Sequence, residues 1–168
     1  MYKRIIFYTI TLILISAITF IVYIDNKPAN VQLQQELIQY NINPLFDDKT
    51  IDKEIMDHEG AFNIVFFNSS DNKTPFLFNN LLSNILADYK LESFDNVVYC
   101  DLKDMDTAEI TETKNRWGFF EYPALVNLEF KDGIINVNSA LEWSATSNLS
   151  YSNIEKWLTD NEVISKSK

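Results

Sequence analysis

Cysteine and histidine are almost absent from this chain of 168 residues. The chain contains one cysteine, Cys100, and one histidine, His58. A single cysteine can form neither an internal disulfide nor a Cys-x-x-Cys redox pair. A single histidine leaves zinc sites and Ser-His-Asp chemistry without enough ligands or catalytic groups. We therefore expect no metal centre, no cofactor and no complete catalytic constellation.

Glycine, proline and basic residues are also scarce. Three glycines and four prolines exclude collagen-like and low-complexity chains. The formal net charge is −10; residues 1–24 contain Lys3 and Arg4 but no acid, so residues 25–168 carry −12. A region that acidic repels phosphate backbones, which excludes nucleic acid as an expected partner.

One long uncharged run is present near the N-terminus. Residues 5–24 are 20 residues without a formal charge, the length that crosses a bilayer core of roughly 30 Å. Lys3 and Arg4 precede the run, so the positive-inside rule places the N-terminus in the cytoplasm and residues 25–168 outside it. A cleaved signal peptide is the alternative, but its apolar region is shorter and ends at a small-x-small site. The sequence therefore predicts an uncleaved, single-pass anchor in the cell membrane.

The remaining residues alternate between helix and strand patterns. Residues 25–47 predict a polar linker and a short amphipathic helix over 31–41, and Thr50 is the expected N-cap of a helix over 51–58. Further helices are expected over 75–90, 107–116 and 152–162, strands over 61–67, 96–102, 123–130 and 134–138, and a loop over 139–150. Strands separated by helices favour parallel crossovers, and Asp132-Gly133 favours a hairpin. The expected fold is α/β: a mixed four-stranded sheet with helices on both faces.

The stretch from Arg116 to Val126, Arg-Trp-Gly-Phe-Phe-Glu-Tyr-Pro-Ala-Leu-Val, continues into a Gly-containing turn at 131–133. Together with the element order, it resembles the thioredoxin fold over residues 48–164, with 165–168 as a tail. The resemblance implies that Pro123 is the cis-proline beside a peptide-binding groove, although Ala124 stands where the family usually has Thr. Among subfamilies, the chain weakly resembles membrane-anchored thioredoxin-like accessory proteins of Gram-positive bacteria, including those that accompany bacteriocin export.

Two parts of the thioredoxin machinery are missing from the sequence. The family places Cys-x-x-Cys after the first core strand, where this chain reads Asn-Ser-Ser-Asp-Asn-Lys-Thr-Pro over residues 68–75. Thiol–disulfide exchange requires a thiolate. The family also has a buried carboxylate on that strand, whereas residues 61–67 contain no acid. We therefore expect a domain without redox activity.

Other reactive residue types each have a plain structural interpretation. Cys100 lies in an apolar strand pattern, so it is expected to pack as a small hydrophobe, with a reactive thiol as the alternative. The spacing of Asp101, Asp104 and Asp106 fits no calcium loop and favours capping of the next helix. Ser69 and Ser70 lack a neighbouring base and are interpreted as loop or cap residues.

Four aromatic residues occur within six positions before Pro123. Phe119 is expected in the core, whereas Phe120 and Tyr122 alternate with it and could line the groove. Such a groove can bind peptide backbone without redox chemistry. The candidate binding residues are Tyr122, Pro123 and Phe120, together with Ser69, Ser70, Asp71 and Asn72 of the loop at the Cys-x-x-Cys place.

These observations predict a membrane-tethered, extracytoplasmic, redox-inactive thioredoxin-like domain that binds a protein or peptide, in an accessory or chaperone-like role in export or envelope assembly. Two alternatives stay open. One is a thiol oxidoreductase that uses Cys100 with a partner thiol. The other is a structural or immunity-type membrane protein whose domain only docks or spaces.

Overall fold

The structure is a computed structural model that describes residues 45–146 and 148–165. Contacts divide the chain into two units, Met1–Gln32 and Leu33–Lys168, and every described residue belongs to the second. The expected anchor over 5–24 and the expected helix over 31–41 lie outside the described residues. No helix in the described ranges has the length and apolar character needed to cross a membrane.

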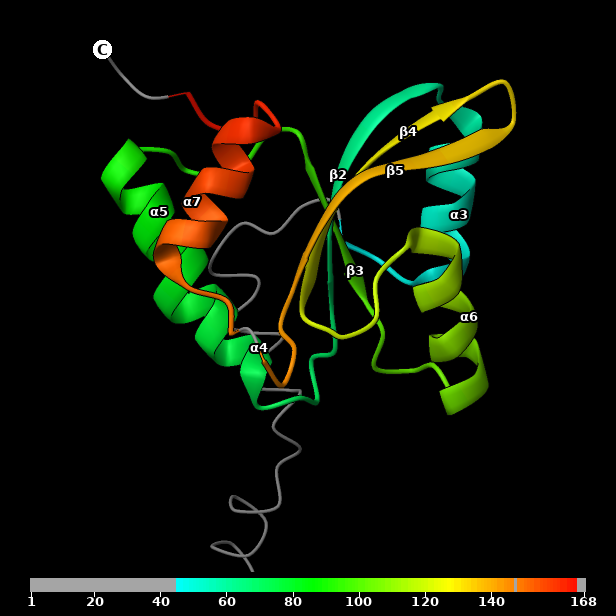
Figure 1. The fold of residues 1–168 in the computed structure, drawn as a ribbon, viewed down its shortest axis with the longest axis horizontal. Helices are drawn as coiled ribbons and strands as arrows, with labels where there is room; N and C mark the ends of the chain where they lie inside the picture. The colour runs from blue at the N-terminus through cyan, green and yellow to red at the C-terminus, as the bar shows by residue number, and fades with distance from the viewer. Residues whose placement is uncertain (1–44, 147, 166–168) are drawn as a thin grey trace, which may run out of the picture. The chain divides into compact units, whose positions relative to one another are not determined.

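A five-stranded mixed sheet forms the centre of the unit (Figure 1), with strand order β1-β3-β2-β4-β5. Its strands are β1 (Leu45–Phe46), β2 (Gly60–Phe67), β3 (Val97–Asp101), β4 (Ala124–Lys131) and β5 (Ile134–Glu142). The strands β1, β3 and β2 are parallel, whereas β4 and β5 are antiparallel to their neighbours. All four predicted strands are present, and β1 adds a short fifth strand within the predicted linker.

The central strand β2 is buried because its sequence is nearly all apolar. Val65 pairs with Tyr99 of β3 on one side and with Leu125 of β4 on the other. Successive side chains point to opposite faces of a strand, so Val65 and Phe67 join one core while Ile64 and Phe66 join the other. A strand covered on both faces needs a continuous apolar run, which explains the composition of this segment.

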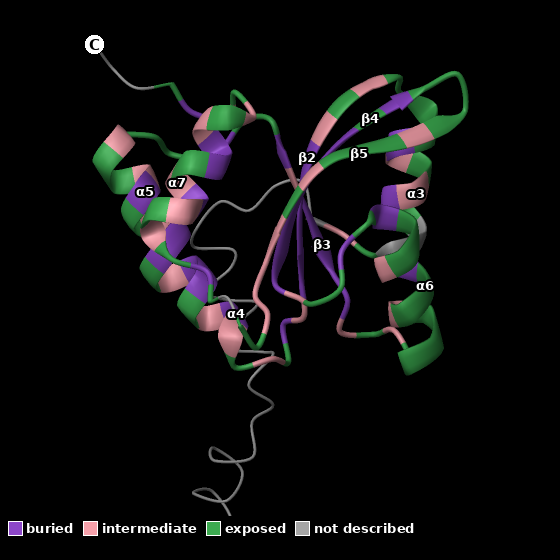
Figure 2. Ribbon diagram, viewed as in Figure 1, coloured by how far each residue is buried: buried purple, intermediate pink, exposed green. Residues whose placement is uncertain are grey.

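Helices cover both faces of the sheet. One face carries a long broken helix, α4 (Lys73–Phe76), the π-helical turn η1 (Leu77–Leu82) and α5 (Ser83–Tyr89), packed beside α7 (Tyr151–Asp160). The other face carries α3 (Asp48–Asp57) and α6 (Thr107–Trp117). Figure 2 shows the inner strands buried between these layers, while β5 is mostly exposed at the edge.

The helices begin at side-chain caps that the sequence carries. Of the two serines that the sequence offers as the cap of the last helix, Ser150 and Ser152, it is Ser150 that caps α7, and of the aspartates expected to cap the preceding helix, it is Asp106 that caps α6. Thr50 was expected to cap α3, but the N-cap is Asp47, which accepts from the Thr50 backbone N–H at 2.8 Å. The Thr50 Oγ1 in turn accepts from the Asp47 N–H at 3.0 Å, which makes a reciprocal capping box. Thr50 is therefore the third helical residue, and α3 starts earlier than predicted.

The hairpin between β4 and β5 turns at Asp132 and Gly133, which both have positive φ, as Asp-Gly hairpins favour. The strand β5 runs to Glu142, so the predicted loop over 139–150 begins later than expected. Pairing with β4 extends it, because Leu141 pairs with Leu125 and the Trp143 N–H donates to the Pro123 carbonyl at 2.9 Å.

The strand order, the strand directions and the cis Tyr122–Pro123 peptide at the start of β4 agree with the thioredoxin-like arrangement that the resemblance implies. Residues 68–72 form the loop that follows the carboxyl end of β2. Residues 118–123 form the loop that precedes β4.

Candidate functional site

The loop after β2 is held by its own polar groups. The Asn68 carbonyl accepts from the Asp71 N–H at 2.9 Å and from the Thr74 hydroxyl at 2.6 Å. The Asn68 side chain accepts from the Ser70 N–H, and the Asp71 carboxylate accepts from the Lys73 N–H, both at 2.8 Å. Asn, Asp and Ser favour such local side-chain bonds to backbone. This segment is therefore a structured turn, at the position that the resemblance equates with the Cys-x-x-Cys motif.

A buried carboxylate on the neighbouring strand anchors this loop. Asp101 is 9% exposed, and its Oδ1 accepts from the Ser69 N–H at 2.9 Å and from the Lys103 N–H at 3.1 Å. Asp101 was grouped with Asp104 and Asp106 as a cap of the next helix, and for Asp101 this was wrong, because Asp106 makes those cap bonds. The bond to Ser69 crosses 32 positions, so spacing along the sequence gave no sign of it.

The loop before β4 is held by a carboxylate from β5. The Glu142 Oε2 accepts from the backbone N–H of Phe120 at 2.6 Å and of Glu121 at 2.8 Å. Gly118 ends α6 in the left-handed region at φ +70, which glycine adopts without steric cost. Phe119 is buried against Phe66, whereas Phe120 is 78% exposed.

Tyr122 lies where the two loops approach each other. The Lys73 Nζ is 3.5 Å from the Tyr122 carbonyl oxygen. The Tyr122 ring is half-buried, and the Lys114 Nζ lies 5.1 Å from its centroid, a cation–π distance. Lys114 also pairs with Glu121 at 3.7 Å. The residue before the cis-proline is thus flanked by two lysines.

A hollow of about 320 Å³ opens beside this point. It is lined by Lys73, Glu121, Trp143, Ser144, Ala145 and Asn148, and we call it the Lys73 hollow. The Trp143 ring packs edge-to-face on Phe76 at 5.6 Å, and Phe76 is itself 40% exposed. This volume lies at the lower end of the range of about 300–1,000 Å³ that is typical of ligand pockets.

The candidate binding residues predicted from the sequence differ in their location and exposure in the structure. The Tyr122 carbonyl contacts Lys73, the first residue of α4, and the Pro123 carbonyl accepts from Trp143, while Asp71 shapes the loop after β2. Ser70 and Asn72 are exposed on the surface of this loop. Ser69 is only 3% exposed, so its side chain is not accessible to a ligand. Among the described residues, no hydrogen bond or ring contact joins Phe120 to residues 69–72.

Sequence reasoning missed Lys73, Trp143 and Glu142. Lys73 lies inside the stretch over 68–75, where the absence of cysteine is the most prominent feature of the sequence. Trp143 was placed in a predicted Ser/Ala/Thr-rich loop, and one of three tryptophans in such a loop is a usable signal. The contact of Glu142 with Phe120 crosses 22 positions and carries no local signature.

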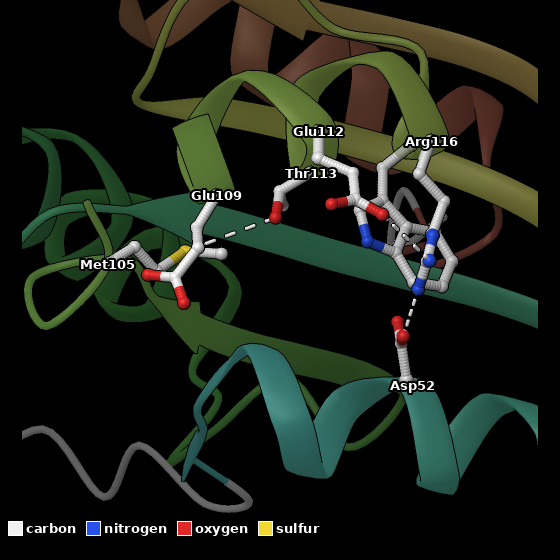
Figure 3. Close-up of a pocket in the computed structure, with 7 residues that line it drawn as sticks. Asp52, Met105, Glu109, Glu112, Thr113 and Arg116 are labelled. Atoms are coloured by element: carbon white, nitrogen blue, oxygen red, sulfur yellow. Dashed lines mark hydrogen bonds and ion pairs between the residues drawn. The ribbon is translucent and has the colours of Figure 1, made fainter. Parts of the chain in front are cut away.

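A second pocket lies between α3 and α6, with a volume of about 220 Å³ (Figure 3). Arg116 of α6 points into it and pairs with Asp52 of α3 and with Glu112 at 3.4 Å. Glu109 accepts from the Asp106 N–H at 2.8 Å. Its charged groups therefore bond to one another and to the helix start, and they join the two helices of this face.

Cys100 is fully buried in the core between the sheet and the α3–α6 layer. This placement matches the packing role expected of it, and it leaves no accessible thiol near the Lys73 hollow. Within residues 45–146 and 148–165, no group of three or more metal-ligating side chains is assembled.

Comparisons with known proteins give structural likenesses alone. No family model and no curated protein sequence matches the chain. Among solved structures, the chain is similar to a Plasmodium falciparum thioredoxin at 10% identity, covering 68% of this chain and 81% of the other, with a TM-score of 0.42. It is also similar to a Trichomonas vaginalis thioredoxin at 17% identity, covering 70% and 93%, again with a TM-score of 0.42. Values this low carry no functional information.

Proposed function

We propose that the chain is a membrane-tethered, extracytoplasmic domain that binds an extended segment of a partner protein without thiol chemistry. The observation that supports this most is the position of Tyr122, whose carbonyl oxygen lies 3.5 Å from the Nζ of Lys73, a residue that lines the Lys73 hollow. The binding role would be an accessory one, in export or in assembly of the envelope.

The backbone of Tyr122 is suited to pair with one residue of a strand. A residue before proline is biased to extended conformations, in which its N–H and C=O point to the same side. In the part of the chain that the structure describes, the Tyr122 N–H has no hydrogen-bond partner, and its carbonyl has the Lys73 Nζ at 3.5 Å. That distance is at the outer limit for a hydrogen bond. An extended peptide could therefore exchange two backbone bonds with Tyr122, as opposite residues do in an antiparallel pair.

Exposed aromatic side chains lie on segments next to this backbone site: Phe120 precedes Tyr122 by two residues, and Phe76 packs on Trp143, whose N–H donates to the Pro123 carbonyl. Phe120 is 78% exposed and Phe76 is 40% exposed, while Trp143 is half-buried at the wall of the hollow. Aromatic residues contribute much of the binding energy at protein interfaces. These rings offer apolar contacts to the side chains of a bound segment.

Two features support tethering and the lack of thiol chemistry. The uncharged run over 5–24, preceded by Lys3 and Arg4, supports an anchor with the domain outside the cytoplasm. The chain has no cysteine in the loop after β2, and Cys100 is buried. The burial of Cys100 favours the binding function over the alternative of an oxidoreductase.

Site-specific photo-crosslinking in native membranes tests this proposal. A benzophenone amino acid at Phe120 should capture a discrete partner, whereas the same probe at Met56, which is 52% exposed on α3, should not. Adding Tyr122→Ala should reduce the Phe120 adduct without lowering the melting temperature by more than a few degrees. Equal capture from both positions, or capture unaffected by Tyr122→Ala, would contradict binding at this site and favour a domain that docks or spaces elsewhere.

A further inference from the structure

We infer that the Lys73 hollow selects an aspartate or glutamate side chain in the bound segment. This inference rests on the proposed function and specifies the chemistry of its partner. The segment would be extended, would pair with Tyr122 through its backbone and would direct one carboxylate to the Lys73 ammonium.

The carboxylates around the hollow have hydrogen-bond or ion-pair partners, whereas the Lys73 ammonium has no carboxylate partner among the described residues. Glu121 pairs with Lys114, Glu142 accepts two backbone N–H groups, and Asp71 accepts the Lys73 backbone N–H. Across residues 45–146 and 148–165, no carboxylate lies within 4.0 Å of the Lys73 Nζ. An ammonium has three donors, and the contact to the Tyr122 carbonyl occupies one. The hollow therefore contains a cation with unused donors, although the chain as a whole is acidic.

The surroundings of Lys73 strengthen a charge interaction at this point. Its side chain is half-buried, and the walls on either side include Trp143 and Ala145. Ion pairs that are partly removed from water are screened less than fully exposed pairs. Asn148 also lines the hollow, and its side-chain amide can donate to the same carboxylate. These groups together can hold one carboxylate with several hydrogen bonds.

The charge distribution also argues against other occupants. Glu121 lines the same hollow, so a second or third negative charge would meet repulsion. The acidity of residues 25–168 disfavours a surface with many negative charges, such as anionic lipid, more than it disfavours a segment with a single carboxylate. A basic segment would place its cation against Lys73. One carboxylate on an otherwise uncharged segment is the chemistry that fits.

Binding of peptide pools to the full 168-residue chain, which is kept in mild detergent, tests the inference. The probes are acetylated, amidated hexapeptide pools in which one internal position is Glu, Gln or Lys and the others are drawn from Ala, Val, Thr, Leu and Tyr. The Glu pool should bind about three- to tenfold more tightly than the Gln pool, as expected for a partly exposed charge pair. Raising the salt concentration should shrink this ratio.

Variants separate the selection of a carboxylate by Lys73 from the binding of a peptide as such. Lys73→Gln should abolish the preference for Glu while binding of the Gln pool persists, and Lys73→Arg should retain the preference. Lys103→Gln is the matched control, because Lys103 is also half-buried but lies outside the hollow. Melting curves check that each variant is folded.

The outcomes distinguish this inference from the proposed function. Equal binding of the Glu and Gln pools, or a preference for Lys, overturns the selection of a carboxylate and leaves peptide binding intact. A Gln pool prepared without C-terminal amidation is a further probe, and the inference is also overturned if that pool binds as tightly as the amidated Glu pool. If no pool binds above background, or if the chain binds only vesicles that contain anionic lipid, the proposed function fails together with the inference.

Discussion

At the scale of single residues, Asp101 anchors the loop after β2, whereas the sequence pattern predicted that it would cap the next helix. Its carboxylate lies at the end of β3 and holds the backbone of the loop after β2. This chain has no acid on β2, so the buried carboxylate near the loop comes from the adjacent strand. Local signals, such as the Asp106 cap, could be predicted from sequence, whereas a bond between residues far apart along the chain depends on how the strands pair.

Asp101→Ala should destabilise the domain by about 1–3 kcal/mol. The substitution leaves the buried Ser69 N–H without its acceptor, and an unsatisfied buried donor carries a cost of that size. Urea unfolding followed by far-UV circular dichroism measures the loss. Asp104→Ala, at an exposed position three residues on, is the control and should change stability by less than about 0.5 kcal/mol. Equal losses in the two variants would contradict the anchoring role.

Cys100 should resist modification in the folded protein. Its side chain is fully buried, and thiol reactivity requires an accessible thiolate. The native full-length chain should react with a coloured disulfide reagent many times more slowly than the same chain in urea. Neither the wild type nor Cys100→Ser should reduce insulin above a no-protein control. Rapid labelling of the native chain, with insulin reduction lost in Cys100→Ser, would revive the oxidoreductase alternative.

At the scale of elements, periodicity predicted most of the sheet and helices because each pattern is local. The apolar run over 61–67 became β2 and the stripe over 75–90 became the α4–η1–α5 helix. The pattern did not predict β1 or the end of β5, because both are defined by pairing with distant strands. The same limit applies to the site. Tyr122 and Pro123 were found from a motif, whereas Lys73 and Trp143 reach the site through the fold.

The contact between α5 and α7 should weaken at high pH. The Tyr151 hydroxyl donates to Asp88 at 2.7 Å, which raises the pKa of Tyr151 to about 12 from the usual 10. A group whose pKa is raised on folding contributes stability that is complete below the unfolded pKa and is lost as pH rises through the folded one. The wild type should therefore lose stability between about pH 10 and 12, and Tyr151→Phe should show a shallower loss in urea titrations. Parallel pH profiles for the two proteins would contradict this coupling.

At the scale of the whole molecule, the proposed topology follows from the charge distribution, and the proposed binding site is compatible with it. The net charge of residues 25–168 is −12, and the two basic residues of 1–24 precede the uncharged run. In the expected topology, the domain faces away from the cytoplasm on a short polar linker. A site on the domain surface would then meet partners that are exported or that lie in the envelope.

The topology can be tested with cysteine substitutions in a Cys100→Ser background. Ser70 is exposed on the loop after β2, so Ser70→Cys should react with a membrane-impermeable maleimide in intact cells. Tyr2→Cys precedes Lys3 and Arg4 and should react only after the membrane is permeabilised, because the positive-inside rule places it in the cytoplasm. The intact mass of 19.6 kDa in the membrane fraction would show that the run over 5–24 is retained. Labelling of Tyr2→Cys but not Ser70→Cys in intact cells would reverse the orientation, and a mature chain that begins after residue 24 would replace the anchor with a cleaved signal peptide. In either case the partner would have to be sought in a different compartment or in solution.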